Sequence, residues 1–348
     1  MAGNVSIIEC KNVGEFLASI SPGGPLDQLS PSSKGGNTKG DPRDWLFRGQ
    51  REATWGLIPS AFRDVTWLEG SNDEWKQRRE WANGGEIWTH ARQVAAEWRL
   101  LKDFFILTNV QGLRLPGDWQ KLRDRFDEFD PMKKDPDSPD KWYEKWPHKK
   151  FWPLVALCQH YRIPTRLLDW SRKPLVAAYF ACEAVAREQA QPAKAESGRK
   201  PGNSAPGKST TGCPRIAVWA WRRRWAERRG VSTHTEFYRK LGIREVHAPR
   251  ASNPNLHMQS GLFTLVKGKR KKDDEPEPQD LKTILENAGS TSLAKPPRPL
   301  LYKITLPQSQ ARELLARLRD RFVQGATIYA GYEGVARSVL EKHARGPL

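Results

Sequence analysis

The sequence predicts an α+β fold in which several helices precede a set of short strands. Between residues 87 and 105, apolar side chains recur at steps of three and four, which is the spacing of one buried helix face. Short β-rich stretches, such as Arg215 to Trp221 and Leu301 to Leu306, come later and are separated by long insertions. Strands and helices therefore do not alternate regularly, and this argues against a parallel sheet with crossover helices.

The first 150 residues are expected to be mainly helical after a short N-terminal strand. Residues 21–42 are rich in Gly, Pro and Ser, which favours a loop, and Asn83-Gly84-Gly85 divides the longest helical stretch into two helices. The expected elements are a strand at 5–10, a helix at 13–20, a strand at 45–47, helices over 74–108, a helix at 118–129 and a loop at 130–150.

The second part of the chain is expected to mix helices, strands and two flexible insertions, 189–214 and 267–299. The first insertion is poor in aromatic residues and rich in Gly, Pro, Ser and Lys, so it buries too little apolar surface to become ordered. The expected helices are 151–160, 175–187, 308–322 and 335–343, and the expected strands are 215–221, 262–266, 301–306 and a short extended piece at 327–329.

Composition limits the class of protein. The 348 residues suffice for one large domain or two ordinary ones, and Lys+Arg 58 against Asp+Glu 40 gives a net charge of +18. This charge favours RNA or DNA as a partner, although a basic surface serves solubility equally well. The four cysteines lack zinc-site spacing, so we expect no metal and a reducing, cytoplasmic setting. No signal peptide, transmembrane span or membrane partner is expected.

Two polar segments are the candidates for a site. Gln159 to Trp170 is densely polar and leads directly into an apolar helical run, and buried polar groups are costly unless they are paired or line a site. The segment 45–50, Trp-Leu-Phe-Arg-Gly-Gln, is expected to deliver Arg48 and a glycine to the end of a strand. There the guanidinium can hold a phosphate by two parallel hydrogen bonds, or it can form a buried ion pair with Asp169 or Glu333.

Other residues of these segments also have two interpretations. His160 can act as an acid or base near neutral pH, or it can be a core hydrogen-bonding group. Tyr161 can stack on a ring or cap a helix end. Asp169 can orient His160 or a substrate hydroxyl, or it can cap the following helix. Trp219 to Trp225 mixes rings with arginines, which suits single-stranded nucleic acid or a solvated helix face.

Five motifs run in order along residues 43–341. They are Phe47-Arg48-Gly49; Trp55, Leu57, Pro59, Ser60 and Arg63; the segment from Gln159 to Trp170; Gln259-Ser260-Gly261-x-Phe263-Thr264; and Glu333-Gly334. In these motifs the chain resembles the FRG domain family. The resemblance implies an FRG domain over 43–348 with a helical insertion at about 70–150, preceded by a strand, a helix and a loop in residues 1–42.

The same positions carry a more distant resemblance to ADP-ribosyltransferases. In that fold an arginine or histidine on the first core strand contacts NAD, a second strand precedes a helix with an Ala-x-x-Phe-Ala pattern, and a glutamate motif precedes another strand. Arg48, Asp169 to Ser171 with the helix from Ala177 to Ala181, and Gln259 stand at these places. The resemblance implies a small split or mixed β-sheet core with an added helical subdomain.

One departure from that pattern bears on catalysis. Gln259 has no carboxylate with which to stabilise a developing oxocarbenium ion. Either Glu333 supplies the carboxylate from another strand, or the site binds a nucleotide without turning it over.

Two functions follow from the resemblance. The first is an NAD-dependent ADP-ribosyltransferase-like enzyme, a toxin or anti-phage effector that acts on nucleic acid and has an antitoxin or defence partner. The second is a module that binds a nucleotide or nucleic-acid end without chemistry. In both, the implied residues converge on one cleft. They are His160, Asp169, Gln259 and Glu333 for catalysis, and Arg48, Gly49, Gln50, Tyr161, Thr165, Arg166, Trp170 and Ser171 for NAD.

Overall fold

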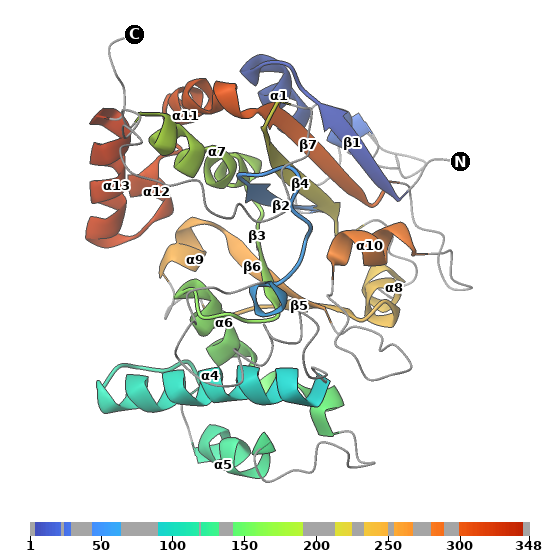
Figure 1. Ribbon diagram of the computed structural model, residues 1–348, viewed down its shortest axis with the longest axis vertical. Helices are drawn as coiled ribbons and strands as arrows, with labels where there is room; N and C mark the ends of the chain where they lie inside the picture. The colour runs from blue at the N-terminus through green and yellow to red at the C-terminus, as the bar shows by residue number, and fades with distance from the viewer. Residues whose placement is uncertain are drawn as a thin grey trace, which may run out of the picture.

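The chain folds around one mixed β-sheet (Figure 1). The computed structural model describes residues 4–21, 24–28, 44–63, 90–117, 120–131, 142–190, 213–224, 233–249, 254–266, 280–288 and 299–343. In these ranges the strand order is β1-β7-β4-β2-β3-β6-β5, and only the β1–β7 pair is parallel. The strands are β1 (Val5–Glu9), β2 (Trp45–Gln50), β3 (Leu167–Ser171), β4 (Arg215–Arg222), β5 (Ile243–Val246), β6 (Gly261–Val266) and β7 (Leu301–Pro307).

Helices cover this sheet and extend one end of the molecule (Figure 1). Local signals start some of them: the Asn12 side chain accepts the Glu15 N–H at the start of the first helix, and Asp280 accepts the Lys282 N–H at another. The helices are α1 (Val13–Ile20), α2 (Pro25–Gln28), α4 (His90–Val110), α5 (Gln120–Glu128), α6 (Trp152–His160), α7 (Pro174–Ala190), α8 (Thr233–Lys240), α9 (Pro254–Met258), α10 (Leu281–Glu286), α11 (Ala311–Arg319), α12 (Gly325–Ile328) and α13 (Gly331–His343).

The sheet is weakly joined between β2 and β3. These strands pair only at Phe47 and Ser171, whereas β2 pairs with β4 along its whole length. One apolar core includes residues from both halves of the sheet, and there the rings of Trp170 and Trp221 lie 5.6 Å apart. The sheet is therefore opened at β2/β3, with the two halves held together by a shared core.

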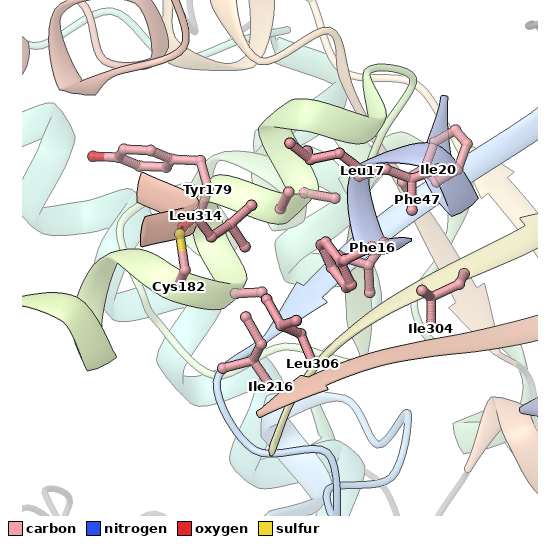
Figure 2. Close-up of a cluster of buried hydrophobic side chains, with 14 of the residues drawn as sticks. Phe16, Leu17, Ile20, Phe47, Tyr179, Cys182, Ile216, Ile304, Leu306 and Leu314 are labelled. Carbon is pink, nitrogen blue, oxygen red and sulfur yellow. Dashed lines mark hydrogen bonds between the residues drawn. The ribbon is translucent and has the colours of Figure 1, made fainter. Parts of the chain in front are cut away.

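Two further cores lie against the helices. One lies between α4, α5, α6 and the β3–β6 part of the sheet. The other lies between α1, α7, α11 and the β7–β4–β2 part, and Figure 2 shows it with the Tyr179 hydroxyl pointing away from the apolar side chains. The labelled members of this core are Phe16, Leu17, Ile20, Phe47, Tyr179, Cys182, Ile216, Ile304, Leu306 and Leu314.

Gly49 lets α7 lie directly on β2. A Cβ atom at this position would stand 2.0 Å from the carbonyl oxygen of Ala177 and 2.7 Å from the backbone nitrogen of Ala181. This glycine was expected to admit a ligand, but the space is filled by helix backbone, which cannot move aside cheaply.

We expect Gly49→Ala to lower the free energy of unfolding by roughly 3 kcal/mol, because the overpacking is against backbone. Gly331→Ala is the matched control: its Cβ would meet nothing within 4 Å, and only its φ of +67° opposes a side chain. That variant should cost about 1 kcal/mol. Urea denaturation of both variants measures the difference, and equal costs would contradict close helix–strand packing at Gly49.

The α+β class is confirmed, as are most of the expected elements. Helix α1 has the expected limits, and α5, α6, α7, β4, β6 and β7 differ by a few residues. Six elements were not anticipated from the sequence pattern: α2, α8, α9, α10, β3 and β5. They are short, and they lie in stretches that were expected to be loops or flexible or were left without an assignment.

Several expectations about local structure were wrong. Strand β2 continues to Gln50, so Arg48 lies inside a strand and not at its end, because pairing with β4 continues past the glycine. Residues 325–328 are helical, the helix after β7 ends at Arg319, and α13 begins at Gly331. The expected helical residues 74–89, with their break at Asn83-Gly84-Gly85, and most of the insertions 189–214 and 267–299 lie outside the described residues.

Candidate functional site

The weak junction of β2 and β3 carries an ion pair. Arg48 Nη1 donates to the backbone oxygen of Asp169 at 2.9 Å and to its carboxylate at 3.2 Å. The Arg48 side chain is only 13% exposed, whereas that of Asp169 is 50% exposed. Asp169 therefore lies in a strand facing Arg48 and does not cap α7. Ser171 accepts the Lys173 N–H instead, at 2.9 Å.

A second arginine lies beside this pair. Arg63 follows the loop after β2, and its Nε donates to the Ile58 carbonyl at 2.7 Å. Burial and the nearby positive charge of Arg48 lower the pKa of Arg63 to about 10, and the negative charge of Asp169 opposes that shift. Arg63 is thus close enough for the charges of Arg48 and Asp169 to act on it, and two guanidinium groups beside one carboxylate favour an anion.

Gln159, near the end of α6, orients the carboxylate. Its Nε2 donates to Asp169 Oδ2 at 2.9 Å, while its Oε1 accepts the hydroxyl of Thr165 at 2.6 Å. Thr165 is buried, and its backbone N–H donates to the Ser60 hydroxyl at 3.1 Å. Thr165 therefore acts on the site through Gln159. Gln159 belongs to one of the sequence motifs, but the sequence predicted no role for it.

His160 is the last residue of α6, and its tautomer follows from its neighbours. Its Nε2 lies 3.3 Å from the side-chain nitrogen of Asn255, whose oxygen accepts the Ala330 N–H at 2.6 Å. A backbone N–H can only donate, so this contact fixes the Asn255 amide and makes His160 Nε2 the acceptor. In the neutral ring the proton is then on Nδ1.

The charge state of His160 also follows from its surroundings. Burial lowers the pKa of His160, and the negative charges of Asp169 and Glu333 only partly oppose this. The ring is therefore neutral at pH 7 and can donate a hydrogen bond from Nδ1. Because the charges of Asp169 and Glu333 both act on its pKa, His160 lies close to both carboxylates.

Glu333 and Gln259 approach from the other elements. Glu333 lies in the first turn of α13, not on a strand, and it pairs with Arg337 at 3.0 Å while its side chain is 53% exposed. Gln259, just before β6, donates to the Ile328 carbonyl at 3.3 Å, and its own carbonyl accepts the Ser171 hydroxyl at 2.7 Å. Gln259 and Asn255 thus tie the α12–α13 region to the ends of α9, β3 and β6.

The comparison with family models assigns the first part of the chain. Residues 43–190 match the model of the FRG domain. The chain contains an FRG domain. The matched range includes Arg48, Arg63, His160 and Asp169, and it ends before Glu333. A search of curated proteins and a search of solved structures found no match.

Some residues of the FRG motifs serve packing. Arg166 is buried and pairs with Glu97 at 2.7 Å, Trp170 is buried in the shared core, and Gln50 is buried and donates to the Gly56 carbonyl at 2.9 Å. With Gly49 under α7, these positions hold the scaffold of the FRG domain, and we do not place them in the ligand site. They were implied as NAD contacts only by the resemblance.

The basic and aromatic stretch at the end of β4 is also structural where it is described. Trp219 and Trp221 are fully buried, so their rings are not available to stack on nucleic-acid bases. Arg223 is buried and pairs with Glu245 at 3.1 Å. Trp225 lies outside the described residues.

A small cavity lies between α4, α6 and the segment before β3. It is lined by Glu97, Trp146 and Arg166 among others, and its volume of about 10 Å³ holds no more than one water. Among the residues placed by the structure, no three His, Cys, Asp or Glu side chains are grouped to hold a metal, and no helix is long and apolar enough to cross a membrane. The Arg48–Arg63–Asp169 cluster is therefore the best candidate site.

Proposed function

We propose that this FRG protein binds NAD at the Arg48–Arg63–Asp169 cluster and transfers ADP-ribose from it. The observation that carries the proposal is the ion pair of Arg48 with the half-exposed carboxylate of Asp169 at the opening of the sheet, with Arg63 close enough for both charges to act on it. Two guanidinium groups suit a pyrophosphate, which has two adjacent anionic groups. The sheet also supports the proposal. Its neighbouring strands β2, β3 and β6 carry or follow the three motifs that resemble those of ADP-ribosyltransferases.

The chemistry requires a carboxylate near the ribose. The bond between ribose C1′ and the nicotinamide nitrogen breaks, and nicotinamide leaves with the electron pair. The ribose becomes an oxocarbenium ion, which the carboxylate of Asp169 or Glu333 stabilises. The acceptor then attacks C1′ and loses its proton to the carboxylate of Glu333.

His160 has a different role from a general base in this scheme. Its Nε2 already accepts from Asn255, so it offers the Nδ1 proton to a carbonyl or hydroxyl of the ligand. Tyr161, adjacent and 62% exposed, is available to stack on a ring of NAD or of the acceptor. Catalysis thus depends on Glu333 and not on His160 for proton removal.

A second function, binding without turnover, has its own support. Gln259 carries an amide where the resemblance places a glutamate, and Glu333 is engaged by Arg337. A site of this kind recognises a nucleotide or a nucleic-acid end and releases it unchanged.

Release of nicotinamide from NAD distinguishes the two functions. With RNA, DNA or cell lysate as acceptor, we expect the wild type to release nicotinamide and Glu333→Gln to do so about 100-fold more slowly with an unchanged Kd for NAD. Glu313→Gln is the matched control, because Glu313 forms an exposed pair with Arg317 on α11 at the same i,i+4 spacing. It should behave as the wild type.

The other outcomes are equally informative. Binding of NAD without nicotinamide release in any mixture would replace the enzyme with the binding module. No binding of NAD at all would refute the enzyme and would leave only a module that binds another nucleotide or a nucleic-acid end. If the protein is a toxin or defence effector, expression of the wild type should arrest growth and expression of Glu333→Gln should not.

A further inference from the structure

The end of α6 contains a strained arginine. Arg162 has φ +65°, its N–H donates to the Gln159 carbonyl at 3.1 Å, and the Ile163 N–H donates back to Cys158 at 3.0 Å. This pattern of bonds closes a helix with one residue in the left-handed conformation, and glycine is the usual residue there. A side chain at this position works against the stability of the helix end.

A second helix ends in the same way far from the candidate site in sequence. Phe322, after α11, has φ +59°, and the Val323 N–H donates to Leu318 at 2.9 Å. Its ring is 81% exposed, so it contributes little to the core. Phe322 therefore provides a comparison with the same backbone conformation outside the site.

Arg162 lies at the edge of the candidate site. It directly follows Tyr161, whose ring is 62% exposed and whose centroid is 5.0 Å from that of His160. Burial raises the pKa of Tyr329, between α12 and α13, and the positive charges of Arg337 and Arg162 oppose this rise. Arg162 is thus close to Tyr329, which lies between α12 and α13, and it is two residues from His160 in the chain.

We propose that Tyr161 and Arg162 bind a single-stranded nucleic acid at the edge of the Arg48–Arg63–Asp169 cluster. An exposed ring stacks on an unpaired base whatever its sequence, and an adjacent guanidinium holds the neighbouring phosphate. The net charge of +18 attracts a polyanion to the protein as a whole.

The role of this strand in the reaction rests on the proposed function: it is the acceptor, brought to the site by Tyr161 and Arg162. Binding itself does not depend on NAD. A double-stranded nucleic acid is disfavoured because its bases are already stacked and do not present a face to Tyr161.

The test is fluorescence anisotropy with labelled single-stranded RNA and DNA of about 12 nucleotides. We expect Tyr161→Ala and Arg162→Gly each to weaken binding about tenfold, and Arg162→Gly to lower the dependence of log K on log salt by about one. Phe322→Gly is the control and should bind as the wild type. Neither glycine variant should lower the melting temperature, because both relieve a left-handed side chain.

The results separate this proposal from the previous one when Kd for NAD is measured on the same samples. The proposal is supported if Arg162→Gly binds oligonucleotide weakly and NAD with unchanged affinity. It is also supported if the wild type binds oligonucleotide and does not bind NAD, and in that case only the NAD site is refuted. Wild-type oligonucleotide affinity in Arg162→Gly and Tyr161→Ala overturns it. A wild type that binds NAD and no oligonucleotide also overturns it, and leaves an acidic protein as the acceptor to test.

Discussion

Replacing Glu97 with alanine is expected to lower the free energy of unfolding by about 3–5 kcal/mol. Glu97 and Arg166 are each 4% exposed and are joined by two hydrogen bonds, of 2.7 and 2.8 Å. Gln93 and Trp146 donate to the same carboxylate at 2.8 and 2.9 Å. Its removal leaves a buried guanidinium without its anion, and this is the costly outcome for such a pair.

The electrostatics of this pair agree with that expectation. Burial alone would raise the pKa of Glu97, but the charge of Arg166 and the three sets of hydrogen bonds outweigh it and hold the pKa below its ordinary value of 4.5. The carboxylate thus contributes stability that is fully present above about pH 4.5, the unfolded value, and is lost as the pH falls through the lower folded value.

Chemical denaturation of three variants tests the prediction. Glu97→Ala should be severely destabilised, whereas the double variant Glu97→Leu, Arg166→Leu should recover much of the loss because no charge remains unpaired. Glu313→Ala, which removes an exposed helical pair with Arg317, should change stability by less than about 0.5 kcal/mol. A cost below about 1 kcal/mol for Glu97→Ala would mean that the ion pair does not hold α4 to the segment before β3.

The second large effect is expected on ligand binding. Arg48→Lys and Arg48→Ala should both fold and both lose at least tenfold in affinity for NAD, about 1.4 kcal/mol. They fold because Asp169, the partner, is half exposed and regains water when the pair is broken. Lysine fails almost as badly as alanine because it lacks the planar fork that holds a phosphate by two bonds.

Arg51→Ala is the matched control for Arg48. Arg51 lies three residues further on and forms an exposed ion pair with Glu188 at 2.9 Å. It should retain both stability and NAD affinity. Thermal unfolding followed by circular dichroism gives the stability, and titration gives the affinity. If the Arg48 variants aggregate or unfold, the ion pair is a structural element and the ligand site must lie elsewhere.

Periodicity and turn residues predicted the long elements of this fold well. Helix α7 and strand β7 have clear apolar patterns, so their limits differ from expectation by only a few residues. The sequence pattern did not predict strand β3. The strand has only five residues, it is buried on both sides, and its middle residue is the charged Asp169. No local signal marks a strand whose polar residue is satisfied by Arg48 from a distant segment.

The candidate site could be found only in part for the same reason. The motifs marked Arg48, His160 and Asp169. An ion pair between Arg48 and Asp169 was one of the two interpretations given for Arg48. Asn255, which fixes the tautomer of His160, lies in the short helix α9 and has no sequence signal. Arg63 was visible in a motif, but its place beside Arg48 depends on how the loop after β2 returns to the sheet.

The most direct test of the proposed site is isothermal titration of NAD into the wild type, Arg48→Lys and Arg63→Lys. If the two arginines hold the pyrophosphate together, the wild type binds one NAD per chain, and each variant weakens binding about tenfold or more while it unfolds at the temperature of the wild type. Wild-type affinity in folded Arg48→Lys and Arg63→Lys, or no binding of NAD by the wild type at millimolar concentration, would contradict the account.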